Sequence, residues 1–412
     1  MTAKQDYYAQ VLFQLMGYKD QYTNLTFAKQ WDDVAERIWN TYKDYISQDG
    51  TTEALAAEQT TDAASDEAKA RALYDYVRRT IKTTGHVGLV SDDLPKPEDV
   101  LEQKEGSAVA KNLLLINLLN QAGVDAYPML IRTRSNGKIN IDWVQTQQFN
   151  RLITVVKLSD RRWFLNPGSP YCPFGQLTPA YNVDNGLLIK ESAGKIINIK
   201  TPDMKNKIAI ETDAQLRNDG GIVCQSTIEF IGMHAVEERS RMHNGDILAY
   251  LEDHLQEVSE NVTIDSFHIS QMDSIHKPLV VQVQYQIPDI VEQTGPVAFF
   301  EAPLLLKMSK NPFVREKRKF AVDYEFARSS SEVINITLPD AMSLSEKPTK
   351  SIARMKDLRF VKIYFISDNE IEVRRTFRLG RTRFLPAHYS KLRQTFEKIV
   401  QSDQDKIVLS NL

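Results

Sequence analysis

The feature that most constrains the fold is a change of hydrophobic period at Gly123. Upstream, the segment 107–121 has the spacing of a buried helix, which Ser107 can cap and Gly123 can end. The apolar face of this helix consists of Leu114, Leu115, Leu118 and Leu119. Downstream, three short runs are rich in β-branched and aromatic residues, as strands are, namely 124–133, 151–157 and 162–165. A helix followed by a meander of strands predicts an α+β fold and argues against a doubly wound parallel sheet.

The composition excludes several classes of protein. With 412 residues, the chain has room for roughly two to four domains. Its 51 basic and 54 acidic side chains leave a net charge of −3, which gives no general attraction to nucleic acid or anionic lipid. Cys172 and Cys224 are too few for a disulfide scaffold. No apolar run approaches the roughly 18 residues of a membrane helix, and the first residues lack the pattern of a secretory signal.

Changes in residue composition and hydrophobic pattern along the chain predict four regions. Residues 1–46 have helical patterning, with an apolar stripe from Trp31 to Tyr42, and a polar stretch follows. Beyond Pro202 the chain becomes rich in strand-like runs, and Asn-Asp-Gly-Gly at 218–221 predicts a hairpin between two of them. We therefore expect a helical segment over 1–64, an α+β core over 65–202, and β-rich domains of antiparallel sheet or sandwich type over 203–310 and 311–412.

Four short motifs of the core resemble those of a known superfamily. Gly-Ser-Ala at 106–108 opens the Leu-rich helix, and Ala-Gly-Val-Asp-Ala at 122–126 leads into the first strand. Phe-Asn-Arg at 149–151 opens the next strand, and Trp-Phe-Leu-Asn-Pro at 163–167 ends the one after it. In this order and type the motifs resemble the transglutaminase-like superfamily, which has a papain-like cysteine enzyme fold. The resemblance implies a papain/transglutaminase-like core followed by β-rich domains.

The resemblance also implies a catalytic triad at three positions. The superfamily has a cysteine at the helix start, where unsatisfied N–H groups favour the thiolate, a histidine as base, and an aspartate that orients the imidazole. This chain has Ala108, Arg151 and Asn166 at those positions. Arg151 and Asn166 are expected on the two arms of one hairpin, so the layout is kept while all three chemical groups differ. The sequence therefore predicts a degenerate triad without a mechanism for acyl transfer.

Other residues offer alternatives for chemistry or binding. Ser107 lacks an activating histidine and is better interpreted as a helix N-cap. Cys172 with His86 is a conceivable relocated pair, although a lone cysteine is more often a packed core residue. The aromatic side chains Trp143, Phe149 and Trp163 fit either the core or the wall of a peptide groove. The candidate binding residues are Arg151, Asn166, Ser107, Asn150 and Trp143.

No feature of the sequence indicates a metal or a cofactor. His234, His243 and His254 do not have the spacing of zinc ligands, and there is no phosphate-binding or dinucleotide-binding glycine motif. The basic stretches Arg315–Lys319 and Arg374–Arg383 are better interpreted as solvated strand faces than as a nucleic-acid surface, because strand alternation separates Arg374 from Arg375.

These observations favour a catalytically inactive member of the superfamily that binds a peptide, a protein or a polysaccharide as a scaffold. Two alternatives remain open: an active cysteine protease or acyltransferase, and a purely structural role of the β-rich domains. Similar bacterial proteins are often exported and have a further N-terminal domain. We therefore expect a periplasmic or cell-envelope protein, and the chain is expected to be a fragment of a longer precursor.

Overall fold

The computed structural model describes residues 3–8, 11, 13, 17–26, 28–47, 50–85, 88–90, 94–295 and 297–411. The chain forms two compact units, one spanning Thr2–Asp203 and the other Met204–Leu412. Residues 199–206, between the last strand of the first unit and the first strand of the second, have no regular secondary structure. Every helix in the described ranges is too short or too polar to cross a lipid bilayer.

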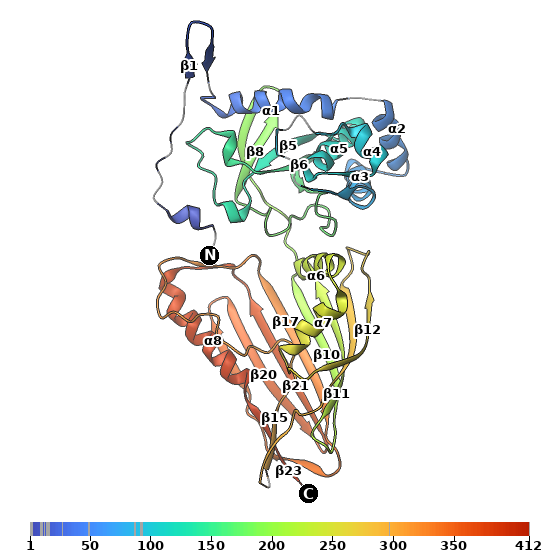
Figure 1. Cartoon of the computed structure of the whole chain (residues 1–412), viewed down its shortest axis with the longest axis vertical. Helices are drawn as coiled ribbons and strands as arrows, with labels where there is room; N and C mark the ends of the chain where they lie inside the picture. Colours follow the sequence, from blue (N-terminus) through green and yellow to red (C-terminus); the bar gives the residue numbers. More distant parts are fainter. Residues whose placement is uncertain are drawn as a thin grey trace. The chain divides into compact units, whose positions relative to one another are not determined.

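The N-terminal unit combines helices with one main sheet (Figure 1). Its elements are η1 (Lys4–Tyr7), β1 (Gly17–Lys19), β2 (Asn24–Thr26), α1 (Trp31–Ile46), α2 (Gly50–Gln59), α3 (Asp66–Thr80), β3 (Lys82–Thr83), α4 (Pro97–Gln103), β4 (Glu105–Gly106), α5 (Ala108–Gln121), β5 (Ala126–Ile131), η2 (Arg134–Asn136), η3 (Thr146–Gln148), β6 (Arg151–Leu158), β7 (Arg161–Leu165), β8 (Asn185–Lys190) and β9 (Ala193–Asn198). The expected helical segment 1–64 is therefore wrong before Trp31, where the described residues include two short paired strands. The segment 1–64 is also not a separate domain, because its helices α1 and α2 pack on α5, the central helix of the core.

The core of this unit lies between its helices and a five-stranded sheet. The strand order is β7-β6-β5-β8-β9, and every neighbouring pair in it is antiparallel. Helices α1, α2, α3 and α4 pack around α5, which itself lies on β5 and β6. The α+β fold class predicted from the sequence is thus confirmed, with the predicted helix 107–121 at its centre.

Helix α5 is buried on all sides rather than on one face. All residues from Val109 to Leu119 are buried, including three polar ones. The amide of Asn117 donates to the backbone oxygens of Tyr45 (3.1 Å) and Ser47 (2.7 Å). The donor groups of these polar side chains find partners in neighbouring segments, which offsets the cost of their burial, whereas Asn117 Oδ1 is enclosed without a hydrogen-bond partner in the described part of the chain.

The C-terminal unit is dominated by strands. Its elements are β10 (Lys207–Leu216), β11 (Ile222–Ile231), α6 (Met233–Asn244), α7 (Ile247–Gln256), β12 (Thr263–Ser270), β13 (Leu279–Ile287), β14 (Glu292–Thr294), β15 (Val297–Glu301), β16 (Val322–Asp323), β17 (Arg328–Thr337), β18 (Met342–Glu346), β19 (Ser351–Met355), β20 (Leu358–Ser367), β21 (Glu370–Leu379), β22 (Arg383–Phe384), η4 (Pro386–His388), α8 (Tyr389–Asp403) and β23 (Lys406–Asn411). The hairpin predicted at 218–221 joins β10 to β11.

One eight-stranded sheet runs through this unit, in the order β12-β13-β11-β10-β17-β21-β20-β19. Its central pair, β10 and β17, is parallel, and the other neighbouring pairs are antiparallel. The expected division between 203–310 and 311–412 is not present, because this parallel pair joins the two regions in one sheet. The prediction missed the pairing because its two strands are far apart in the sequence.

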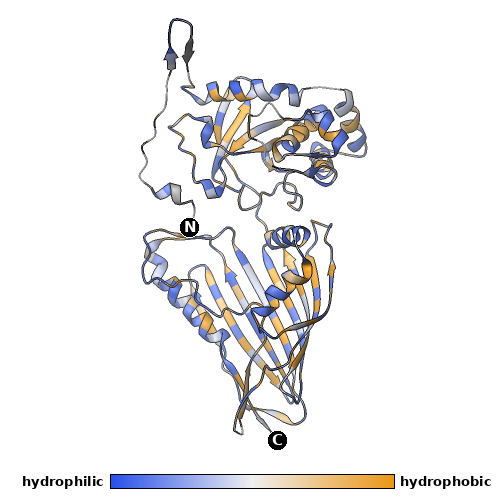
Figure 2. Ribbon diagram, in the orientation of Figure 1, coloured by the Kyte–Doolittle hydropathy of each residue, from blue (hydrophilic) through white to orange (hydrophobic). Residues whose placement is uncertain are grey.

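The two faces of the large sheet differ in polarity, as the alternating colours along its strands show (Figure 2). One face is apolar and is covered by α6 and α7, by α8, and by the small sheet β14-β15-β23-β18. On β20 and β21, the side chains that alternate with those of the apolar face point to the second face and are exposed or half-buried, for example Arg359, Phe365 and Arg374. We call the second face the open face.

Candidate functional site

The start of α5 is the expected position of a nucleophile. Ser107 is the N-cap of the helix, and its Oγ accepts a hydrogen bond from the backbone N–H of Ala110 (3.2 Å). The side chain of Ser107 is buried, so its predicted role as a cap is confirmed and its hydroxyl is already engaged. Ala108, the first residue of the helix, is half-buried. The helix start therefore presents a methyl group at the position where the resemblance predicts a thiol.

Asn166 follows the last residue of β7 and is enclosed by hydrogen bonds. Its Oδ1 accepts from Asn112 Nδ2 (3.1 Å) and from the backbone N–H of Gly168 (3.1 Å). Its Nδ2 donates to Ser169 Oγ (3.1 Å). The side chain is only 2% exposed. Asn166 thus holds the turn after β7 in place.

Asn112 links the helix start to the hairpin. Its Nδ2 donates both to the backbone oxygen of Ala108 (2.8 Å) and to Asn166 Oδ1 (3.1 Å). Its Oδ1 accepts from Thr154 Oγ1 (3.0 Å) on β6. Asn112 and Thr154 are fully buried. The sequence analysis missed both residues, although an asparagine within a Leu-rich helix is a signal of a buried polar contact.

Gly168 brings Ala108 and Asn166 close together. A Cβ added at Gly168 would lie 2.8 Å from the Cβ of Ala108 and 3.1 Å from Asn166 Oδ1. A side chain at residue 168 would therefore overlap the helix start, and the backbone can approach so closely only as glycine. The predicted proximity of residues 108 and 166 is thus present in the structure.

Arg151 opens β6 on the other arm of the hairpin. Strands β6 and β7 are antiparallel, with Thr154 opposite Leu165, so Arg151 and Asn166 lie on two arms of one hairpin as predicted. The arginine is half-buried, and its Nη1 donates to the backbone oxygen of Asn150 (2.7 Å). A guanidinium has five donors in a planar fork.

The remaining candidate binding residues lie in the segment before β6. Asn150 is bound to Thr133, accepting from its backbone N–H (2.9 Å) and donating to its Oγ1 (3.0 Å). Trp143 is half-buried, and its indole Nε1 is enclosed without a hydrogen-bond partner in the described part of the chain. Phe149 is 5% exposed and packs edge-on against Trp31, so it belongs to the core rather than to a groove wall.

Lys111 is a buried cation one turn into α5 that the sequence analysis missed. Its Nζ donates to the backbone oxygen of Ile81 (2.5 Å) and to Thr83 Oγ1 (3.1 Å). Burial lowers the pKa of Lys111 to about 8. Because its ammonium group is bound to the segment after α3, Lys111 fixes that segment to the helix start.

Neither cysteine has the environment of a nucleophile. Cys172 is fully buried, and its Sγ lies 3.3 Å from the backbone oxygen of Gln176. Cys224 is buried in the sheet of the C-terminal unit. Burial raises the pKa of each thiol to about 12, so both are protonated at neutral pH. His86, the conceivable partner of Cys172, lies outside the described residues.

The histidines of the C-terminal unit form no metal site in the described ranges, where three or more His, Cys, Asp or Glu side chains nowhere converge. His234 packs edge-on against Phe326, and burial lowers its pKa to about 4. His254 stacks beside Tyr250, whose hydroxyl donates to Glu238 (2.5 Å). These side chains have packing roles within α6 and α7.

Two stretches of the sequence match known families. Residues 53–165 match the family described as Transglutaminase-like superfamily. Residues 297–409 match a family described as a domain of unknown function with a solved structure, DUF3858. The chain therefore has a transglutaminase-like core, as its motifs predicted, and that core is followed by a β-rich unit.

A solved structure supports the same fold. It is described as the crystal structure of a putative protease from Parabacteroides distasonis ATCC 8503, with a TM-score of 0.55 and 14% sequence identity. The similarity covers 97% of this chain and 63% of the other, so this chain spans less than two thirds of that protein. At this identity the similarity establishes the fold alone. No curated protein matches the sequence significantly.

Proposed function

We propose that this chain is a non-catalytic transglutaminase-like protein that binds a carboxylate of a peptide, protein or polysaccharide ligand. The observation that carries the proposal is the set of side chains at the three triad positions, Ala108, Arg151 and Asn166. Alanine has no nucleophile, and a guanidinium stays protonated and cannot accept the proton of a thiol. A carboxamide has no charge to stabilise an imidazolium. The three changes together remove each step of acyl transfer.

The contacts of Asn166 support this proposal. Its carboxamide bonds to Asn112, Gly168 and Ser169, and these contacts join the helix start to the hairpin. An aspartate that orients a histidine needs a free oxygen directed at the imidazole. The oxygen of Asn166 instead accepts two hydrogen bonds from within the fold. Residue 166 thus acts in holding the structure together.

Arg151 and the helix start support the binding role. The first turn of an α-helix has a partial positive charge of about half a unit, and Ala108 leaves it half-buried rather than enclosed. Arg151 adds a permanent charge on the neighbouring strand. The register places Arg151 on the same sheet face as Ile131 and Ile153, whereas Leu152 and Thr154 face α5. The arginine and the helix start therefore lie on different sides of β6, and a ligand carboxylate would bind Arg151 itself, a planar, multi-donor group. We further propose a periplasmic or cell-envelope scaffold role, by the same resemblance.

The alternative function is an active cysteine protease or acyltransferase. The description of the solved structure as a putative protease favours it. In this chain, such an activity would have to use Cys172 or Cys224, since no other thiol is present. The reactivity of these thiols therefore separates the two functions.

We expect both thiols of the native protein to react slowly with a small electrophile such as iodoacetamide. Burial keeps Cys172 and Cys224 protonated and out of contact with solvent. The measurement is mass-spectrometric labelling over time, with and without urea. The variant Ala108→Cys is the positive control, because a thiol at a helix start is expected to ionise and react readily. Rapid labelling of one native thiol, with loss of a hydrolytic activity, would establish the active enzyme instead.

Removal of the Arg151 guanidinium should weaken binding of acidic peptides. We expect Arg151→Ala to lose about 1.5–3 kcal/mol of affinity, the range for a hydrogen bond to a charged group, measured by calorimetry with glutamate-containing peptides. The matched control is Arg162→Ala, an exposed arginine on the same hairpin, which should leave the affinity unchanged. Absence of binding at millimolar peptide, or equal affinity of both variants, would refute the carboxylate site.

A further inference from the structure

Three exposed arginines lie side by side on the open face of the C-terminal sheet. Arg354 on β19 pairs in register with Arg359 on β20, and Arg359 pairs with Arg378 on β21. All three side chains are exposed. The row continues across the sheet, since Arg378 is opposite Ser329 and Ser329 is opposite Lys207. Four cations thus lie in one line perpendicular to the strands.

This arrangement is unfavourable for the isolated unit. Like charges directly opposite one another on neighbouring strands repel and destabilise the sheet. Within the described ranges, Arg354, Arg359 and Arg378 have no acidic side chain within ion-pair distance. The positive potential of the row is therefore uncompensated by the fold.

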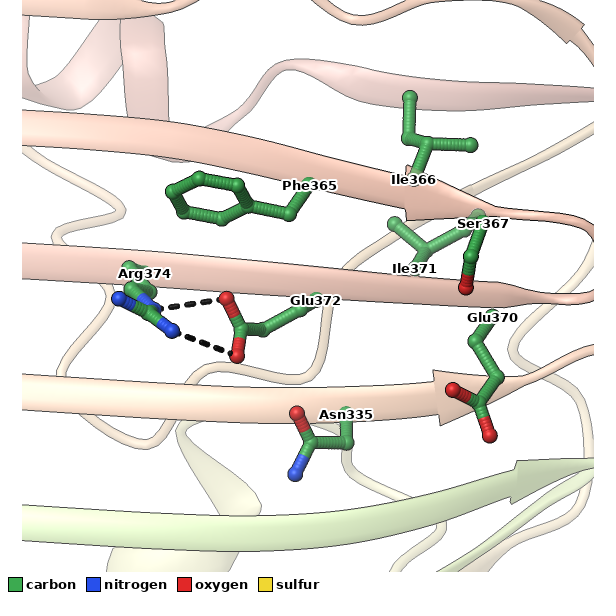
Figure 3. Close-up of a pocket in the computed structure, with 8 residues that line it drawn as sticks. All are labelled: Asn335, Phe365, Ile366, Ser367, Glu370, Ile371, Glu372 and Arg374. Carbon is green, nitrogen blue, oxygen red and sulfur yellow. Dashed lines mark hydrogen bonds and ion pairs between the residues drawn. The ribbon is translucent and has the colours of Figure 1, made fainter.

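Two nearby arginines show the usual arrangement. Arg374, on the same open face, binds Glu372 at 2.7 Å on its own strand and lies over the ring of Phe365, as Figure 3 shows. Arg381 binds Asp357 at 2.9 Å. The unpaired row is thus a local feature and not a general property of the arginines in this unit.

On one side of the row, the neighbouring side chains of the open face are uncharged. The next positions along the strands are Ile352, Val361, Thr376, Ser331 and Ala209. None of these side chains is charged or aromatic, so an anionic chain can lie along the row without meeting an acid. The absence of aromatic rings at these positions argues against single-stranded nucleic acid, whose bases are usually bound by stacking.

We propose that the row Arg354–Arg359–Arg378 binds an acidic polysaccharide with one carboxylate on each sugar. Neighbouring strands are about 4.8 Å apart, so the row repeats its charge at about the length of one sugar ring. An extended acidic polypeptide advances only about 3.4 Å per residue, so its carboxylates do not match the row one to one, and the long arginine side chains can reach carboxylates on either edge of a sugar chain. The spacing therefore favours a linear polyuronate. This surface lies in a different unit from the carboxylate site proposed above and stands independently of it.

The probe for this proposal is polygalacturonate. Its binding to the full chain is measured by biolayer interferometry at low and at physiological salt. We expect binding that weakens as salt rises. Arg359→Ala should weaken it about twofold to fivefold, the range for one exposed ion pair. The triple variant Arg354→Ala/Arg359→Ala/Arg378→Ala should weaken it about tenfold or more. It is expected to fold, because it removes a repulsion.

Arg374→Ala is the matched control, since it removes an arginine of the same face that is already paired, and its affinity should equal that of the wild type. The proposal would be overturned if the triple variant bound as tightly as the wild type, or if the wild type did not bind at millimolar uronate. Equal or tighter binding of poly-L-glutamate would assign the row to an acidic protein instead. Equal binding of single-stranded DNA would make it a general polyanion surface and would also contradict the proposal.

Discussion

Arg375→Ala should lower the free energy of unfolding of the C-terminal unit by about 3–5 kcal/mol, the range for removing one partner of a buried ion pair. The guanidinium of Arg375 on β21 binds Asp403 at the end of α8, with Nε–Oδ1 at 2.9 Å and Nη2–Oδ2 at 2.8 Å. Both side chains are at most 1% exposed. Without the arginine, Asp403 would remain as an uncompensated charge in the core between helix and sheet.

The carboxylate of Asp403 has a second role that increases the effect. Its Oδ2 also accepts the backbone N–H of Met308 (2.9 Å), so the pair fixes the segment after β15 as well as α8. Lys362 on β20 donates to the backbone oxygen of Ser402 (2.7 Å), beside the same pair. Loss of the Arg375–Asp403 pair is therefore expected to loosen the end of α8 from the sheet.

The measurement can be made specific to the unit concerned. All four tryptophans, Trp31, Trp39, Trp143 and Trp163, precede residue 204, so their fluorescence follows unfolding of the N-terminal unit. Far-UV circular dichroism follows both units. We expect Arg375→Ala to shift only the transition that tryptophan fluorescence does not report.

The neighbouring residue supplies the control. Arg374→Ala removes an exposed ion pair on the other face of the same strand and should cost at most about 1 kcal/mol. Equal effects of the two variants would mean that the buried pair contributes no more than an exposed one. The double variant Arg375→Met/Asp403→Leu should recover much of the stability, because it removes both charges of the pair together.

Much of the local structure was predictable because its signals lie within a few residues. The cap at Ser107, the leucines of α5 and the glycine at 123 defined that helix correctly. Strand alternation correctly assigned Arg374 and Arg375 to opposite faces of β21, one exposed and one buried. These features depend on side-chain periodicity and turn chemistry, which are encoded locally.

Features that depend on distant segments were not predictable. The parallel pairing of β10 with β17 joins residues about 120 positions apart, and no local pattern indicates it. Strands β8 and β9 were not among the predicted strands, although they complete the sheet of the N-terminal unit. At the candidate site, the contact of Asn112 with Thr154 and Asn166 required the helix and the hairpin to be brought together.

Glu332 should make the C-terminal unit less stable as the pH rises from about 4.5 to about 7. Its carboxyl on β17 is fully buried opposite Arg375, and it accepts the backbone N–H groups of Leu305 (2.5 Å) and Leu306 (3.1 Å). Burial, with a smaller effect of Asp403, raises the pKa of Glu332 from 4.5 to about 7, although Arg375 and the two N–H groups oppose the shift.

The direction of this pH dependence follows from which state of the chain, folded or unfolded, holds the proton of Glu332. Between these two pKa values the folded unit keeps the proton on Glu332, whereas the unfolded chain releases it, so raising the pH favours unfolding. The shift corresponds to about 3 kcal/mol as an upper value, at about 1.4 kcal/mol for each pH unit. The stabilisation is fully present below about pH 4.5 and is lost by about pH 7.

Glu332→Gln is the test, since glutamine stays neutral and can still accept a backbone N–H bond. We expect urea unfolding, followed by circular dichroism, to show the wild type losing stability relative to this variant by up to about 3 kcal/mol between pH 4.5 and pH 7.5. Glu370→Gln, an exposed change on neighbouring β21, should give a profile parallel to that of the wild type. A profile of Glu332→Gln parallel to the wild type would mean that the buried carboxylate is already ionised at pH 4.5. In that case Arg375 and the two N–H groups of residues 305 and 306 would outweigh its loss of hydration.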